Sequence, residues 1–537
     1  MTNTLDLRVA PLGRVEGDLD LKVKITDGVV TDAWTEAAMF RGFEIILKGK
    51  DPQAGLIMTP RICGICGGSH LYKACYAIDT AWATYVPPNA TRIRNIAQAC
   101  ETLLSIPRWF YAIFAIDLVN AKYAGAPSYA EAVRRFSPFV GTSYEPGLTL
   151  SAKPVEIYAI FGGQWPHSSF MIPGGIMGAP TLSDVTRSTA IIDSWNHEWL
   201  EKQWLGASVD EYLSTVKTYE DLLHWGDGSE ARANSDLAFF IKYALEIGLD
   251  KYGQGYGNYL ATGSFLSPDL YQHPTIEGRN AALGTRAGVY ANGQFFDFDQ
   301  ARVSEDITHS YFRGTGSRHP FDGVTDPIDP ADGPAQGKYT WAKAPRYDVP
   351  NLGAVPLEVG PLARQVVAGR DGGDGSWQDV DGVILDGLNT AGPSVLLRLL
   401  ARLHEAPKYY MNVRKWLAEI DLHDSFYSKP EERDGQGFGG TEAARGALCD
   451  WVVLKDGKIE NYQVVTPTAW NIGPRDGNEN VGPMEKTFIG TPVGNPQDPV
   501  ELGHVARSYD SCLVCTVHAY DGKTGKELAK FRMDGMV

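Results

Sequence analysis

The first 60 residues show an alternation of apolar and polar positions that is typical of β-strands. Residues 5–26 alternate on both sides of a glycine-flanked turn at 13–17, which predicts a β-hairpin. Asp27-Gly28 predicts a two-residue turn and a second strand pair. A short helix is expected after Arg41-Gly-Phe-Glu44, so residues 1–60 should form a β-rich region that leads into a cysteine pair.

The pattern then becomes helical. Apolar positions recur every three or four residues in five stretches: 71–86, 90–105, 107–120, 182–202 and 209–225. These stretches predict helices that pack as a bundle, with Asn89 capping the second helix and Pro107 beginning the third. Asp117 lies in an apolar run, where a carboxylate costs free energy unless it is paired. It is either a satisfied core residue or part of a site.

The second half of the chain is mixed. Its first part is rich in Gly, Asp and aromatic residues, which indicates short strands and loops, and helices resume at 395–406 and 409–421. Residues 451–466 predict a hairpin across Asp456-Gly457. We therefore expect a multidomain α+β fold with a central helical bundle and peripheral β-hairpins and small sheets. The expected divisions are 1–60, 61–225, 226–380, 381–518 and a tail at 519–537.

Size and charge limit the function classes. At 537 residues the chain exceeds the size at which one core usually stops growing. A net charge of −16 argues against a nucleic-acid partner, because phosphate binding needs a basic surface. The N-terminus lacks the apolar run of a signal peptide, and the most apolar stretch, 106–119, is too short and too polar for a direct membrane span.

Two C-x-x-C pairs lie near opposite ends of the chain, Cys63 with Cys66 and Cys512 with Cys515. Each turn places two sulfurs on one side of a loop, and four thiolates can fill the coordination sphere of a soft metal. A structural zinc site is the simpler alternative, but zinc ribbons usually separate their pairs by roughly 15–20 residues. Here most of the chain separates the pairs, which indicates a centre that the whole fold encloses.

Other residues near these pairs gain meaning only in context. Arg61 precedes Cys63 by two positions, and a cation beside a thiolate lowers the thiol pKa. His70 follows Cys66 by four positions and is either a ligand or donor, or a satisfied buried histidine. Glu16, taken alone, is interpreted as a solvated turn carboxylate.

The two cysteine motifs together resemble those of the large subunit of the nickel–iron hydrogenases. They read Arg61-Ile-Cys-Gly-Ile-Cys66 with His70, and Asp510-Ser-Cys-Leu-Val-Cys-Thr-Val-His518. Five further motifs follow the family's order: Arg41-Gly-Phe-Glu44, Lys343-Ala-Pro-Arg-Tyr347, Glu358-Val-Gly-Pro-Leu-Ala-Arg364, Glu442-Ala-Ala-Arg-Gly446 and Pro467-Thr-Ala-Trp-Asn471. The residues around these motifs are most similar to those of the uptake enzymes of cyanobacteria and their actinobacterial relatives.

The resemblance implies a nickel–iron centre with carbon monoxide and cyanide on the iron. Cys63 and Cys512 would be terminal ligands of nickel, and Cys66 and Cys515 would bridge the two metals. Thr468 would donate a hydrogen bond to a cyanide.

The resemblance also implies roles for residues around that centre. Arg445 would lie over the open bridging site, with Asp117 and Asp510 completing the group above it. Glu16 would take a proton from Cys512, in place of its reading as a solvated turn residue.

A second metal is implied as well. Glu44, the carbonyl of Val464 and His518 would hold a magnesium ion, for which oxygen-rich ligation is suitable.

The activity implied is heterolytic oxidation of H2 to protons and electrons, with uptake favoured. All four motif cysteines are used, so this chain would hold no iron–sulfur cluster and would require an iron–sulfur small subunit. Electrons would reach a quinone or another acceptor through a partner. A maturation endopeptidase would remove residues 519–537. We also expect a higher oligomer of heterodimers in the cytoplasm, with any membrane association made through a partner.

Two other classes of protein remain as alternatives. A non-catalytic scaffold subunit related to the quinone module of respiratory complex I would share the fold, but those relatives lack the four cysteines. A zinc-stabilised structural protein would need only the cysteines and would leave Glu44, Arg445 and His518 unexplained. The identity of the bound metal separates these readings.

Overall fold

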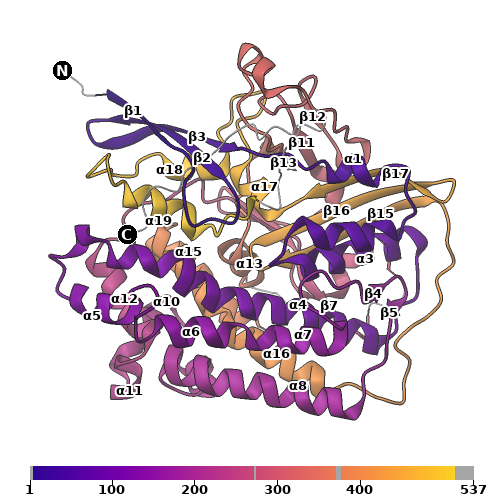
Figure 1. Cartoon of the computed structure of the whole chain (residues 1–537), viewed down its shortest axis with the longest axis horizontal. Helices are drawn as coiled ribbons and strands as arrows, with labels where there is room; N and C mark the ends of the chain where they lie inside the picture. The colour runs from indigo at the N-terminus through magenta and orange to yellow at the C-terminus, as the bar shows by residue number, and fades with distance from the viewer. Residues whose placement is uncertain (1–3, 271–273, 371–376, 514–537) are drawn as a thin grey trace.

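The computed structural model describes residues 4–270, 274–370 and 377–513, and it combines many helices with small antiparallel sheets (Figure 1). Helices fill the lower half of the view, and most of the sheets gather in the upper half. The α+β fold with a helical bundle and small sheets is therefore confirmed. The division into five segments stays a prediction.

The N-terminal sheet contains β1 (Thr4–Val9), β2 (Leu19–Thr26) and β3 (Val29–Ala37), in the order β1-β2-β3. Both predicted hairpins are confirmed. Asp27 and Gly28 have φ angles of 51° and 81°, the left-handed pair that a tight two-residue turn requires. The connection from β1 to β2 carries Glu16.

The first cysteine pair lies between short helices and a fully buried one. The chain passes through α1 (Phe43–Leu47) and α2 (Ala54–Met58) and then enters α3 (Gly67–Trp82), of which every residue is buried. Helix α3 packs on β15 (Gly435–Ala443) at two glycines. A Cβ atom on Gly437 or Gly439 would lie 1.9 or 2.0 Å from a carbonyl oxygen of α3, so only glycine permits this approach.

The central helix is longer than the pattern predicts. Helix α4 (Pro88–Arg108) begins at Pro88, runs through Pro107 and continues as a π-helix (Trp109–Phe114) and a 3₁₀-helix (Ala115–Val119). The expectation that Pro107 begins a new helix is therefore wrong. Asn89 does not cap α4, because its side chain instead bonds the backbone of Asp421.

One described helical stretch, Pro88–Val119, is long and apolar enough to cross a membrane by length and composition. Its most apolar window is 72% buried inside the protein, as the core helix of a globular protein would be. Because this window is mostly buried, the length and composition of the stretch are weak evidence for a membrane span.

Further helices complete the bundle along α4 and the turns that follow it (Figure 1). They are α5 (Tyr129–Phe136), α6 (Tyr144–Ser151), α7 (Lys153–Gly162), α8 (Leu182–Trp195), α12 (Asp236–Glu246), α15 (Val395–His404) and α16 (Ala406–Ala418). The sequence pattern predicts α8, α15 and α16 but not α5, α6, α7 or α12. Residues 209–225, expected to be one helix, divide into α9 (Val209–Thr215), α10 (Tyr219–Leu223) and a 3₁₀ turn.

Short strands form the lobe between these helices, largely as expected. They are β6 (Tyr259–Ala261), β7 (Ser264–Leu266), β8 (Leu283–Thr285), β9 (Gly288–Ala291), β10 (Gln294–Phe296), β11 (Val303–Asp306), β12 (Ser317–Arg318), β13 (Ala344–Val349) and β14 (Gly353–Val355).

The last sheet carries the motif Glu442–Gly446 into the interior of the molecule. It contains β15, β16 (Gly446–Lys455) and β17 (Lys458–Val465), and the predicted β16–β17 hairpin is confirmed. Strands β15 and β16 pair down to Ala443 opposite Gly446, so Ala444 and Arg445 form a two-residue tip. Helix α13 (Pro361–Ala368) begins beside this tip, where a Cβ atom on Gly446 would lie 2.5 Å from the nitrogen of Gly360.

Candidate metal centre

Three cysteine thiols from opposite ends of the chain meet in the interior. The sulfur atoms of Cys63, Cys66 and Cys512 all lie within 4.8 Å of one another, and the Cys63 and Cys512 sulfurs are 3.5 Å apart. All three residues are buried. Within residues 4–270, 274–370 and 377–513, these three cysteines form the one group of three or more His, Cys, Asp or Glu side chains placed closely enough to bind a metal ion. Cys515, the fourth predicted thiolate, lies outside the described residues.

The N-terminus of α3 fixes the first pair. Cys66 is the N-cap residue of α3, and the amide of Ile65 donates a hydrogen bond to the Cys63 sulfur at 3.4 Å. The buried carboxylate of Glu101, on α4, accepts hydrogen bonds from the amides of Gly68 and Ser69 at 2.8 and 2.7 Å. A carboxylate at this position satisfies the free amides of the first helical turn and suits the helix dipole.

Cys512 is held by backbone contacts with the Glu16 turn and by one hydroxyl group. It pairs with Glu16 in a parallel β-bridge, in which the Glu16 amide donates to the Ser511 carbonyl at 3.1 Å. The Leu513 amide donates to the Glu16 carbonyl at 2.5 Å. The Cys512 amide donates to the Thr468 hydroxyl at 2.9 Å, on α17 (Pro467–Ile472). Thr468 therefore touches the backbone of the predicted thiolate.

Arg445 lies beside the thiols and is held by Asp510. Its Nε donates to the Asp510 carbonyl at 2.8 Å, and its Nη2 donates to the Asp510 carboxylate at 3.0 Å. Burial by itself would lower the pKa of Arg445. The charges of Asp510 and of Cys512, Cys66 and Cys63 outweigh burial and raise that pKa well above its usual value. Its Nη1 has no hydrogen-bond partner among the described residues, which leaves one donor free for a ligand.

Glu16 lies next to the same group. Burial raises the pKa of its carboxyl, Asp510 and Cys63 raise it further, and Arg445 opposes the change. The turn that carries Glu16 is thus part of the interior, although the side chain keeps partial solvent access. A carboxyl in such a place can hold a proton between a thiol and the surface.

Asp117 is brought to different partners. Its carboxylate forms ion pairs with Arg14, in the Glu16 turn, and with Arg507 at 2.5 Å, on α19 (Val500–Ser508). Burial would raise the pKa of Asp117, but Arg507, His504 and Arg14 reverse this and lower it. The role of Asp117 above the metal centre stays a prediction, as do the roles of the other site residues.

The predicted magnesium ligands line a small cavity. Glu44 accepts a hydrogen bond from the Val464 amide at 3.1 Å and pairs with Lys343 at 2.8 Å. Glu305 lies 3.3 Å from the same ammonium. The cavity of about 80 Å³ that these residues line offers carboxylate oxygens of the kind that magnesium prefers. His518, the third predicted ligand, lies outside the described residues.

Several residues that belong to none of the motifs also reach the site in the structure. They are Arg14, Glu101, Glu305, Arg402 and Arg507. Arg14 and Arg507 lie near Glu16 and Asp510 in the sequence but belong to no motif, and Glu101, Glu305 and Arg402 come from more distant segments. Only the buried ion pairs and hydrogen bonds reveal them.

Comparison with known proteins identifies the family. The family described as nickel-dependent hydrogenase matches residues 41–143 and 123–518. The chain therefore belongs to the nickel-dependent hydrogenase family. The resemblance that the motifs carry is confirmed, and so is the class of enzyme.

Relatives match along almost their whole length. The periplasmic NiFeSe hydrogenase large subunit of Desulfomicrobium baculatum is 32% identical over 545 residues, which cover 97% of this chain and 96% of that protein. The uptake hydrogenase large subunit of Rhizobium leguminosarum bv. viciae is 29% identical, with 98% and 97% covered. The crystal structure of a reduced, active form of the D. baculatum Ni-Fe-Se hydrogenase is 31% identical, with a TM-score of 0.79 and coverage of 96% and 100%.

The described residues fit a nickel–iron centre. Three buried soft thiols converge on one point, and a fixed cation beside them offsets the charge that thiolates bring. The contacts of the Cys512 backbone with Glu16 and with the Thr468 hydroxyl hold Cys512 beside the Cys63–Cys66 pair.

Proposed function

We propose that this chain is the catalytic subunit of a hydrogenase that oxidises H2 to protons and electrons, with uptake as its direction. The observation that carries the proposal is the convergence of Cys63, Cys66 and Cys512 within 4.8 Å, beside Arg445. Family membership and the uptake relative support the assignment. A thiolate-bound nickel–iron centre, with carbon monoxide and cyanide on its iron, supplies the redox and Lewis-acid chemistry for heterolytic cleavage.

The residues of this chain handle the proton. The Cys512 thiolate, with the fixed cation of Arg445 nearby, accepts the proton that leaves hydrogen. Glu16 receives it next, because its backbone adjoins Cys512 and its carboxyl has a raised pKa. Asp510 fixes the guanidinium of Arg445 through two contacts. Thr468 orients Cys512 and offers its hydroxyl to a cyanide.

The remaining parts of the assignment concern partners and place. Hydrogenase large subunits generally pair with an iron–sulfur small subunit, and we propose that one receives the electrons here and passes them to a quinone or another acceptor. Magnesium at Glu44, Val464 and His518, processing of residues 519–537 by an endopeptidase, a higher oligomer of heterodimers and a cytoplasmic location complete the proposal.

Metal analysis tests this function. The purified complex should contain one nickel per chain and iron in excess of the partner's clusters, with infrared bands of carbonyl and cyanide ligands. Zinc alone, in a chain whose mass shows that residues 519–537 have been removed, would contradict the proposal. Zinc in a chain that still carries them would call for the same measurement on the processed form.

A further inference from the structure

The hairpin tip that carries Arg445 is buried. Ala443 and Ala444 are each 3% exposed, and the tip is the two-residue turn between β15 and β16. Carbonyl groups at such a turn point away from the strand ladder, and leaving them without partners in the interior costs free energy. The groups that satisfy these carbonyls therefore hold the tip in place.

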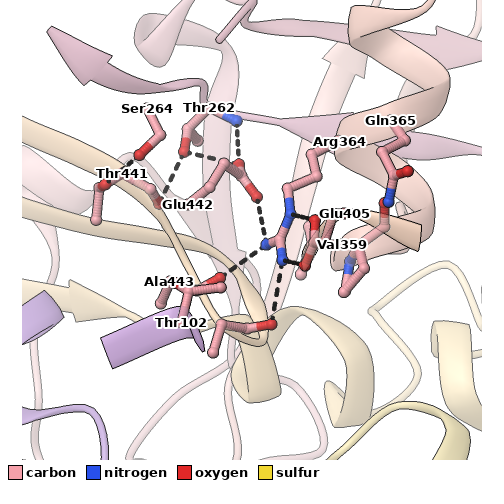
Figure 2. A network of polar contacts seen from close by, with 12 residues as sticks. Thr102, Thr262, Ser264, Val359, Arg364, Gln365, Glu405, Thr441, Glu442 and Ala443 are labelled. Atoms are coloured by element: carbon pink, nitrogen blue, oxygen red, sulfur yellow. Dashed lines mark hydrogen bonds and ion pairs between the residues drawn. The ribbon is translucent and has the colours of Figure 1, made fainter. Parts of the chain in front are cut away.

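Arg364 satisfies the first carbonyl (Figure 2). Its Nη1 donates to the Ala443 carbonyl at 2.8 Å. Its Nε and Nη2 form a two-pronged pair with the Glu405 carboxylate at 2.8 and 2.5 Å. Glu442, just before the tip, lies 3.6 Å from Nη1. The side chains of Arg364, Glu405 and Glu442 are fully buried, so this network is fixed on the bundle side of the tip.

Arg402 donates the shorter of two hydrogen bonds to the second carbonyl, which also accepts one from Arg364 Nη2 at 3.4 Å, and Arg402 reaches the other half of the site as well. From α15, its Nη1 donates to the Ala444 carbonyl at 2.9 Å and lies 3.3 Å from the Asp510 carboxylate. The opposite oxygen of that carboxylate accepts from Arg445. Arg402 therefore joins the tip to the segment that ends in Cys512.

Arg402 stays charged at neutral pH although its environment lowers its pKa. Burial lowers the pKa of its guanidinium to about 10, and Asp510 opposes the decrease. At neutral pH the side chain is still a cation. Its guanidinium also lies over the ring of Trp109, 4.7 Å from the ring centroid, which restricts its orientation.

We propose that Arg402, assisted by Arg364, is a positioning residue that sets the direction of Arg445 toward the thiols. The inference rests on the proposed function, because the orientation of Arg445 affects turnover only if the adjacent centre oxidises hydrogen. A planar guanidinium can donate to the Ala444 carbonyl and face the Asp510 carboxylate at once. The single ammonium of lysine is a point charge and cannot reproduce that geometry.

The first test compares two arginine-to-lysine variants in the complete complex. Arg402→Lys should lower kcat for hydrogen oxidation about tenfold and change KM for hydrogen less than twofold, with nickel content unchanged. Arg346→Lys is the matched control, because Arg346 is also buried and bonds one carboxylate, Asp476, and the Pro474 carbonyl. We expect full turnover in the control. An equal loss of kcat in both variants would overturn the proposal.

A double-mutant cycle tests whether Arg402 acts through Arg445. In an Arg445→Lys background, the further change Arg402→Lys should lower turnover less than twofold, because the group it positions is gone. A tenfold loss in both backgrounds would mean that Arg402 acts independently of Arg445, and the proposal would fall.

A third measurement does not depend on turnover. Amide hydrogen exchange over residues 441–448 should be at least tenfold faster in Arg402→Lys than in the wild-type complex, and unchanged in Arg346→Lys. If the wild-type complex lacks nickel and does not oxidise hydrogen, the proposed function fails. Faster exchange in Arg402→Lys would still show that Arg402 holds the β15–β16 tip in place. Unchanged exchange in Arg402→Lys would overturn the inference that Arg402 holds this tip.

Discussion

Asp510 and Asp117 are both buried carboxylates held between two arginines, but their surroundings shift their pKa values in opposite directions. Asp510 lies between Arg445 and Arg402, and burial raises its pKa, with a further increase from Cys63. Asp117 lies between Arg14 and Arg507, and their charges lower its pKa despite burial.

The difference comes from what lies beyond each pair of arginines. The Asp510 cluster (Asp510, Arg402 and Arg445) faces the thiols, which bring negative charge of their own. The Asp117 cluster (Asp117, Arg14 and Arg507) has no such neighbour among the causes of its shift, and Arg14 is 32% exposed. The same composition thus gives a raised carboxyl pKa in one place and a lowered carboxyl pKa in the other. Four experiments can break or sharpen this contrast.

The largest effect is expected for Arg445→Lys. Turnover should fall about a thousandfold, equivalent to about 4 kcal/mol of activation free energy, because lysine cannot keep both contacts with Asp510. Nickel and iron contents should be unchanged. The matched change in the other cluster, Arg507→Lys, should cost less than tenfold in turnover. Equal losses in the two variants would remove the functional contrast between the clusters.

Asp117→Asn should mainly reduce stability. The substitution leaves two arginines without their counter-charge, and breaking a buried ion pair costs about 3 kcal/mol. The native pKa of Asp117 is lowered, so its contribution is fully present above about pH 4 and decreases as the pH falls below that value. Urea unfolding of the complex at pH 7 measures the loss.

The control for Asp117→Asn is Asp326→Asn, which breaks the exposed pair with Arg313 and should cost less than about 1 kcal/mol. If the two variants unfold at the same urea concentration, Asp117 does not stabilise the fold through its ion pairs. A thousandfold loss of turnover in Asp117→Asn would instead place it with Asp510.

His504 should give the Asp117 side of the molecule a sensitivity to acid. Its Nδ1 lies 2.7 Å from the Tyr252 hydroxyl, and burial lowers its pKa to about 4, with Asp117 and Glu501 opposing and Arg507 and Lys122 assisting.

A histidine that folds in its neutral form stabilises the protein above its unfolded pKa of about 6.5, and the contribution is lost as the pH falls toward 4. At pH 5 the loss is about 2 kcal/mol relative to neutral pH. His504→Gln should therefore reduce the drop in urea midpoint between pH 7.5 and pH 5, whereas the exposed His423→Gln should leave it unchanged. An identical drop in His504→Gln would refute the neutral form.

Thr468→Val should have the smallest effect, on the Asp510 side. It removes the hydroxyl that accepts the Cys512 amide and leaves a buried donor unsatisfied, at a cost of about 1 kcal/mol. Thr468→Ser keeps the hydroxyl and should retain the wild-type unfolding midpoint. If valine and serine variants unfold alike, the hydroxyl contact contributes nothing to holding Cys512.

Local patterns predicted much of the fold, because strand alternation and tight-turn residues depend on near neighbours. The hairpins at Asp27-Gly28 and Asp456-Gly457 follow from such signals. The pattern failed at Pro107, because tertiary packing carries α4 through the proline. It also missed α12, which lies in a stretch interpreted as short strands and loops, and β15, whose glycines give no strand alternation.

The sequence by itself determined the family of this protein. Two C-x-x-C pairs, with the motifs around Glu44, Arg445 and Thr468, were enough to indicate the nickel–iron hydrogenase family, since ligand type and spacing are properties of the chain. The tertiary structure decided which charges meet. It placed Asp117 with Arg14 and Arg507, and it placed Arg402 between Ala444 and Asp510. Electrostatic partners are chosen by distance in space, and residues hundreds of positions apart become neighbours only when the chain folds.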